Sequence, residues 1–282
     1  MVEMTHGSRT RRRKAAATIL LVAGSIVAVQ ALVAPSANAA RRCGGKAATI
    51  VGKSKSEILK GTPRADVIVG GGGDDSLIGK GGRDLLCGGK GNDELQGGPG
   101  NDRLYGEAGS DLLIEVAGNN LLSGGDQGDA LAPGAGNDRL EGGAEAGSML
   151  LQQDIVVFDD VLIVAPSKFR APGPVTLDLT TGKATGLGTD SILGGIEEYV
   201  GTRHGDTMRG SPGQDFFRGA EGNDRLFGGD ENDFLQGEDG DDALFGEGGD
   251  DDLNGGNGND SADGGPHIAG DFCVAETVVD CE

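Results

Sequence analysis

The sequence predicts an all-β chain built from short strands and turns that repeat every nine residues. Acidic or amide residues recur at this interval in two series, from Asp66 to Asp138 and from Asp206 to Asp260. An apolar residue stands two positions after each of them, and glycines recur two, four and five positions before. A helix or an ordinary hairpin meander does not fit this period. Each unit is therefore expected to be a six-residue glycine-rich turn followed by a three-residue strand with one inward-facing apolar side chain.

The composition argues against most enzymes and against nucleic-acid-binding proteins. Only 36% of the 282 residues are hydrophobic and 4% are aromatic, so the core must be thin. The net charge of −21 is spread along the chain, which argues against nucleic acid as a partner. High glycine content and high charge are also typical of disorder, but the strict period favours an ordered chain.

The N-terminus has the pattern of a secretory signal peptide. A basic cluster at residues 9–14 precedes an apolar run from Ala15 to Val33, and the run ends near the small-residue site Ala37-Asn38-Ala39. We expect cleavage after Ala39, so that residues 1–39 are removed and the secreted chain has no membrane span. A signal anchor is the alternative, because the apolar run nearly reaches spanning length. The choice between the general and the twin-arginine export route stays open.

All four cysteines follow the expected cleavage site. Even numbers of cysteines in an exported chain indicate disulfides. We expect the pairs Cys43–Cys87 and Cys273–Cys281, although the sequence alone allows three connectivities.

Fifteen of the sixteen positions in the two series are aspartates, and we call them the repeat aspartates. They are Asp66, Asp75, Asp84, Asp93, Asp102, Asp111, Asp129, Asp138, Asp206, Asp215, Asp224, Asp233, Asp242, Asp251 and Asp260. With their glycine-rich turns, as in Gly88-Gly89-Lys90-Gly91-Asn92-Asp93, they resemble the RTX nonapeptide repeat G-G-x-G-x-D-x-U-x. The resemblance implies a parallel β-roll, a β-solenoid in which two nonapeptides form one coil. It also implies several Ca²⁺ ions between the turns of successive coils, held by aspartate carboxylates and turn carbonyls. Oxygen ligands suit this hard cation.

The turns match the motif unequally. The best matches end at Asp75, Asp84, Asp93, Asp102, Asp215, Asp224, Asp242, Asp251 and Asp260. Four turns, which end at Asp66, Asp129, Asp206 and Asp233, have a residue other than glycine two positions before the aspartate. These residues are Arg64, Gln127, His204 and Glu231. A residue other than glycine at this position argues against the regular turn conformation at these four turns.

The position of Asn120 is the largest departure from the motif. Asn120 replaces a carboxylate, and Glu115 and Val116 stand where its turn should have glycines, which predicts a weak or empty site. Glu57 could open the first series one unit early, as a degenerate cap. Polar residues directly before the repeat aspartates, such as Asp74 and Asn92, are expected to shape the turns rather than bind metal.

The repeats divide the secreted chain into five parts. They are an N-terminal segment (40–56), a first repeat block (57–143), a strand-rich insertion (144–200), a second block (201–265) and a C-terminal disulfide hairpin (266–282). The insertion loses the glycine period and gains alternating apolar runs, which predict strands joined by hairpin turns. An active site would have to lie there, and its candidate acids and bases are Asp154, Asp159, Asp160, Asp178 and Glu197. No nucleophile with a nearby histidine accompanies them, so we expect no enzyme.

These features together predict a secreted calcium-binding protein in which metal binding is coupled to folding. The alternative is a cell-surface adhesion or interaction module that uses the calcium-ordered roll as a scaffold. Its candidate partner face is formed by Phe216, Phe227, Phe234 and Phe245, which form two pairs 18 residues apart.

Overall fold

The computed structural model describes residues 41–144, 155–158, 173–186, 188–194, 196–266 and 270–281. Strands, turns and loops make up all of these residues. None of these ranges contains an apolar helix of membrane-spanning length. The predicted signal peptide and the aspartates at positions 154, 159 and 160 lie outside the described residues.

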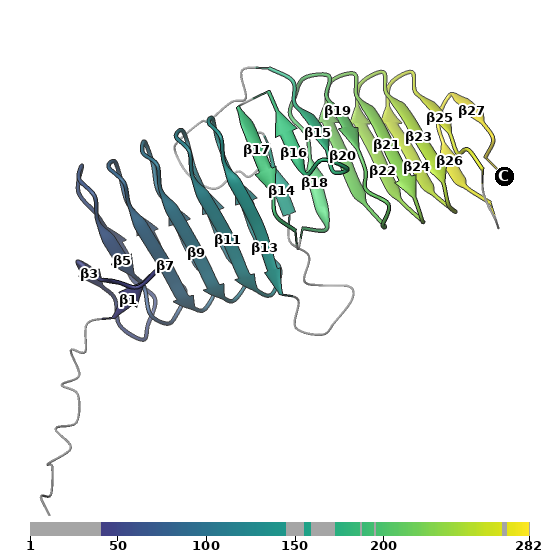
Figure 1. Cartoon of the computed structure of the whole chain (residues 1–282). Helices are drawn as coiled ribbons and strands as arrows, with labels where there is room; N and C mark the ends of the chain where they lie inside the picture. Colours follow the sequence, from purple (N-terminus) through teal and green to yellow (C-terminus); the bar gives the residue numbers. More distant parts are fainter. Residues whose placement is uncertain are drawn as a thin grey trace, which may run out of the picture. The chain divides into compact units, whose positions relative to one another are not determined.

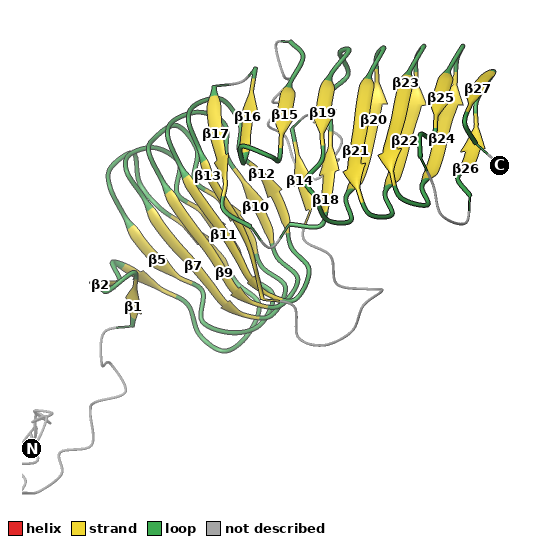
Figure 2. Cartoon of the chain, turned by 45° about the vertical axis from the view of Figure 1, so that its right-hand side comes forward, coloured by secondary structure: helices red, strands yellow, loops and turns green. Residues whose placement is uncertain are grey.

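The chain winds into a parallel β-solenoid with two large sheets (Figures 1 and 2). The 11-stranded sheet contains β4 (Ile58–Lys60), β6 (Ser76–Ile78), β8 (Glu94–Gln96), β10 (Leu112–Ile114), β12 (Ala130–Ala132), β14 (Ile155–Val157), β18 (Glu198–Val200), β20 (Phe216–Glu221), β22 (Phe234–Asp239), β24 (Asp252–Asn257) and β26 (Phe272–Val274).

The second large sheet has 14 strands. In spatial order it contains β3 (Ile50–Val51), β5 (Val67–Val69), β7 (Leu85–Lys90), β9 (Arg103–Ala108), β11 (Leu121–Asp126), β13 (Arg139–Ala144), β17 (Thr189–Ile192), β16 (Lys183–Thr185), β15 (Thr176–Asp178), β19 (Thr207–Arg209), β21 (Arg225–Asp230), β23 (Ala243–Gly248), β25 (Ser261–Asp263) and β27 (Thr277–Val279). A short antiparallel pair, β1 (Arg42–Cys43) with β2 (Lys46–Ala47), precedes the solenoid.

Within the repeats, successive strands alternate between the two sheets, so each strand pairs with the strand one full coil later. Leu77 of β6 pairs with Leu95 of β8, and Leu86 of β7 pairs with Leu104 of β9, both 18 residues on. These four leucines are completely buried and belong to one core that runs along the solenoid. The predicted fold, an all-β parallel β-roll with one inward apolar residue per unit, is confirmed.

The strand-rich insertion continues both sheets instead of interrupting them. Strand β14 lies parallel between β12 and β18 in the 11-stranded sheet. In the other sheet β16 lies antiparallel between β15 and β17, as expected for hairpins, and the three strands connect β13 to β19. The two repeat blocks are therefore joined by a modified coil through which strand pairing is continuous.

Both expected disulfides are present, one near each end of the solenoid. Cys43 and Cys87 connect β1 to β7 and pack in a small buried cluster with Val69 and Leu85. Cys273 of β26 is bonded to Cys281, which follows β27.

Candidate functional site

The repeat aspartates all occupy the last position of a turn, and all are buried. Each is at most 8% exposed to solvent, although aspartate is rarely buried without a partner. The apolar residue two positions later anchors the following strand in the core, and this fixes the aspartate at the point where the turn meets the strand. The periodic pattern thus places a column of carboxylates along each side of the solenoid.

In most of these carboxylates one oxygen belongs to a hydrogen-bond ladder. The backbone N–H of Asp75 donates to Oδ1 of Asp93 at 2.7 Å, and the N–H of Asp93 donates to Oδ1 of Asp111 at 2.7 Å. The second block repeats the arrangement, for example from Asp206 to Asp224 at 2.7 Å. The Oδ1 atoms of the ladder therefore tie each coil to the preceding one, and Oδ2 of these aspartates takes no part in the ladder.

In most turns the other oxygen, Oδ2, is buried and accepts no hydrogen bond. We call these the open turns. They end at Asp75, Asp84, Asp93, Asp102, Asp111, Asp138, Asp224, Asp233, Asp242, Asp251 and Asp260. A buried carboxylate oxygen without a partner is unfavourable, because it has lost its hydration without replacement.

The surroundings of Oδ2 fit a hard cation. A Cβ added to Gly88 would contact both Oδ2 of Asp93 and the carbonyl oxygen of Gly106, which begins the turn one coil later. The same cradle recurs in the second block at Gly219, between Oδ2 of Asp224 and the carbonyl of Gly237. Carboxylate and carbonyl oxygens are the ligands that calcium takes. Among the described residues, no group of three or more His, Cys, Asp or Glu side chains is arranged to hold a metal.

The electrostatics of the open turns favour a cation as well. Burial, together with the charges of neighbouring acidic side chains, raises the pKa of Asp84, Asp93 and Asp242 to about 6, although backbone N–H groups oppose the shift. For Asp111, Asp138, Asp224 and Asp233 the same causes raise the pKa to about 7. Desolvation and like charge both disfavour the ionised form, and a bound cation would reverse this preference.

Three turns satisfy their aspartate internally, and we call them the self-capped turns. They end at Asp66, Asp206 and Asp215, and each has Thr or Ser four residues before the aspartate. In the Asp206 turn the N–H of Thr202 donates to Oδ2 at 2.5 Å and its hydroxyl donates to Oδ1 at 3.1 Å. Thr62 and Ser211 donate from N–H and hydroxyl to Oδ2 of Asp66 and Asp215 at 2.6–3.0 Å. Their second oxygen therefore has a protein donor.

The four turns with a residue other than glycine at the second-last position divide into two kinds. Gln127 and Glu231 adopt φ values of 79° and 68°, in the left-handed region that Gly91 takes in a regular turn. Arg64 and His204 lie in self-capped turns, where their N–H groups donate to the hydroxyls of Thr62 and Thr202. The first pair keeps the repeat conformation, at the strain that a side chain with positive φ carries.

The polar residues before the repeat aspartates form a second ladder on the exposed side of the turns. The N–H of Asn92 donates to Oδ1 of Asp74 at 2.9 Å, and the N–H of Ser110 donates to Oδ1 of Asn92 at 3.1 Å. In the second block, Asn259 donates to Asp241 at 3.0 Å. These side chains hold the turns in register from outside.

Several residues of the ladder lie outside the nine-residue period. Asp190 of the insertion accepts the N–H of Asp138 at 2.9 Å, 52 residues away, and is 1% exposed. Asp271 accepts the N–H of Asp251, and Glu276 ends the other column by accepting the N–H of Asp260. Ile192 and Cys273 follow Asp190 and Asp271 by two positions, so a search for Asp-x-apolar without a fixed period would have found both.

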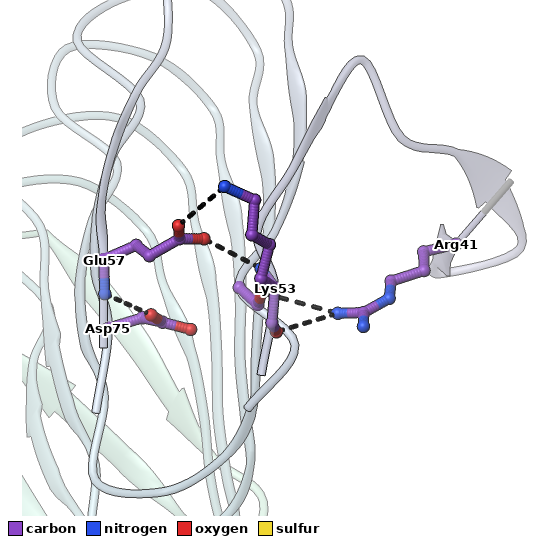
Figure 3. Close-up of polar contacts among 5 residues, drawn as sticks. Arg41, Lys53, Glu57 and Asp75 are labelled. Atoms are coloured by element: carbon purple, nitrogen blue, oxygen red, sulfur yellow. Dashed lines mark hydrogen bonds and ion pairs between the residues drawn. The ribbon is translucent and has the colours of Figure 1, made fainter. Parts of the chain in front are cut away.

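Charged side chains from the N-terminal segment contact the first turns of the solenoid (Figure 3). Glu57 donates its N–H to Oδ1 of Asp75 at 2.8 Å, so it occupies a ladder position as a cap. Its carboxylate folds back to the N–H of Lys53 at 2.8 Å and to the Lys53 ammonium at 3.5 Å. The Arg41 guanidinium donates to the carbonyls of Lys53 and Gly70 at 3.4 and 3.5 Å. A side-chain cation thus contacts turn carbonyls at the end of the stack.

The phenylalanines of the predicted partner face stack on one another across neighbouring coils. The rings of Phe216 and Phe234 lie 5.5 Å apart, and those of Phe227 and Phe245 lie 4.8 Å apart and nearly parallel. The Arg209 guanidinium covers Phe227 at 4.5 Å from the ring centre. Phe234 is 37% exposed. These contacts give the rings a role in holding coils together, and their role as a partner face stays a prediction.

The comparison with known families agrees with this geometry. The family described as RTX calcium-binding nonapeptide repeat (4 copies) matches residues 51–86, 84–113, 116–140, 200–235 and 227–262, which together make up more than half of the chain. The comparison with curated proteins finds no match. The periodic turns, the parallel roll and the family match lead to one identification: the chain belongs to the RTX calcium-binding nonapeptide repeat family.

Proposed function

We propose that this protein is a secreted calcium-binding protein in which calcium binding between stacked turns is coupled to folding. The observation that carries the proposal is the set of open turns, where a buried Oδ2 accepts no hydrogen bond and in most cases lies beside a main-chain carbonyl of the next coil. The N-terminal signal-like segment and the two disulfides support secretion, because such bridges persist in oxidising compartments.

The coupling to folding follows from the weakness of the metal-free fold. The repeats bury one apolar side chain per nine residues, which leaves little hydrophobic stabilisation to offset chain entropy. Folding also brings like charges together along each column of aspartates. The ligand atoms come together only in the folded coil, so the metal binds the native state in preference to the unfolded chain. The free energy of metal binding therefore stabilises the fold.

The open and the self-capped turns differ in whether the protein supplies a partner for Oδ2 of the aspartate. We propose that the open turns hold the calcium ions, through Oδ2 of one coil and carbonyl oxygens of the next. In the self-capped turns Thr62, Thr202 and Ser211 supply the donors that Oδ2 requires. These turns stand at the start of each repeat block, where they give the first coil of the block an order that does not depend on calcium.

A calorimetric calcium titration of residues 40–282 tests this assignment with two matched variants. Asp224→Asn removes the carboxylate of an open turn, and Asp206→Asn removes that of the adjacent self-capped turn, while both keep an Oδ1 acceptor for the ladder. We expect Asp224→Asn to lower the number of bound ions and Asp206→Asn to leave it unchanged. Wild-type affinities should be about 10⁻⁴ to 10⁻³ M, as in other extracellular modules. Equal ion numbers in both variants, or no binding by the wild type, would contradict the proposal.

The proposal contains no catalytic step, because it uses the carboxylates of the repeats as calcium ligands. A cell-surface interaction module is the remaining alternative, and it would need a partner face in addition to the calcium sites. The phenylalanine stacks are its candidate face, and their rings pack against one another across neighbouring coils.

A further inference from the structure

Glu115 occupies a position that is glycine in the regular turns. It begins the turn that ends at Asn120, and its side chain is only 1% exposed. Its Oε2 accepts the N–H of Gly98 at 3.2 Å, one coil earlier. Its Oε1 is buried and accepts no hydrogen bond. The side chain therefore reaches back into the space between two coils and leaves one carboxylate oxygen without a partner there.

A second partnerless oxygen points to the same place. A Cβ added to Gly97 would contact both Oε1 of Glu115 and Oδ2 of Asp102. Oδ2 of Asp102 is likewise buried and accepts no hydrogen bond. In most other open turns the corresponding cradle, such as that of Gly88, is formed by one carboxylate oxygen and one main-chain carbonyl. At Gly97 it is formed by two carboxylates.

The backbone accommodates the extra side chain by a local separation of the coils. The N–H of Gly97 lies 3.4 Å from the carbonyl of Ile114, whereas the equivalent bond one coil earlier, from Gly79 to Gln96, is 2.8 Å. The ladder itself is intact. Asn120 accepts the N–H of Asp102 at 2.9 Å and donates its own N–H to Asp138 at 2.6 Å.

We propose that Asp102 and Glu115 form a calcium site with two carboxylates in the open turn of Asp102. The proposal rests on the proposed calcium function and makes this site tighter than those of the other open turns. Glu115, which begins the turn one coil later, supplies the second carboxylate. Because affinity in calcium sites rises with the number of charged ligands, this site should fill before the other open turns.

The test is a calcium titration of residues 40–282, followed by calorimetry and by native mass spectrometry at low calcium. Glu115→Gln keeps the size of the side chain and removes its charge. We expect it to lose the tightest class of ion, with the Kd for the first ion raised about tenfold or more. Glu141→Gln, which removes an exposed charge from β13 in the same block, is the matched control and should bind like the wild type.

Glu115→Gly is a second variant, which keeps the test valid if Glu115→Gln fails to fold, because glycine is the regular residue at this position. It should lose the same tight ion. Wild-type affinity and ion number in both Glu115 variants would overturn the inference. A gain of one ion in Glu115→Gly would also overturn it, because Glu115 would then block a site instead of forming one. If the wild type itself bound no calcium, the proposed function would fail as well, so the two failures are distinguishable.

Discussion

Acidification should restore β-structure to the metal-free chain. Burial and neighbouring charges raise the pKa of Asp111, Asp138, Asp224 and Asp233 to about 7 in the folded chain. In the unfolded chain the pKa of the same groups is about 3.9. A carboxyl group with a raised folded-state pKa favours folding when it is protonated. This contribution is fully present below about pH 4 and is lost as the pH rises through 6 to 7.

The measurement is circular dichroism of residues 40–282 in a calcium chelator across this pH range. β-Structure should increase as the pH falls from about 8 towards about 4. Calcium affinity should change in the opposite sense, because protons compete with the metal for the same carboxylates. A metal-free chain whose β-content is the same at both ends of the range would show that the buried aspartates do not limit folding.

Gly88→Ala should eliminate the site at Asp93 and destabilise the calcium-loaded protein. The new Cβ would fill the cradle between Oδ2 of Asp93 and the carbonyl oxygen of Gly106, where we place the ion. Both are held by the ladder and by strand pairing, so neither can move aside without a shift of the coil. We expect one ion fewer by calorimetry. The free energy of unfolding should fall by about 1–3 kcal/mol from overpacking alone, and the lost ion adds to this.

Gly72→Ala is the matched control for this substitution. Gly72 lies in the adjacent turn on the same side, and the nearest atoms to a Cβ there are 3.8–4.0 Å away, which is ordinary packing distance. Its ion number and unfolding midpoint should equal those of the wild type. Equal losses in both variants would mean that glycine is needed for backbone freedom in these turns rather than for the metal cradle.

The nine-residue period was enough to predict most of the architecture. A single apolar residue per unit, such as Leu77 or Leu95, leaves one way to bury it, which is to stack units in columns. The same period places the repeat aspartates in line. The insertion was less readable, because β14 continues the parallel stack while β15 to β17 form antiparallel hairpins. Nothing in the local pattern of these short strands distinguishes the two kinds of pairing.

The chemistry of individual turns depended on neighbours that the sequence does not reveal. The turn of Asp215 matches the motif well, yet Ser211 satisfies its second oxygen. The turn of Asn120 matches poorly, yet Glu115 brings a carboxylate to the coil before it. Asp190 joins the ladder from 52 residues away. In each case the deciding contact is with a backbone group or side chain positioned by the coil.

The most direct test of the account is the β-content of residues 40–282 near neutral pH, measured by circular dichroism first in chelator and then in millimolar calcium. We predict that the chain in chelator has little β-structure and that calcium produces the signal of the complete roll in one cooperative transition. A chain that shows the same β-structure and the same unfolding midpoint with and without calcium would contradict the claim that metal holds the stacked turns together.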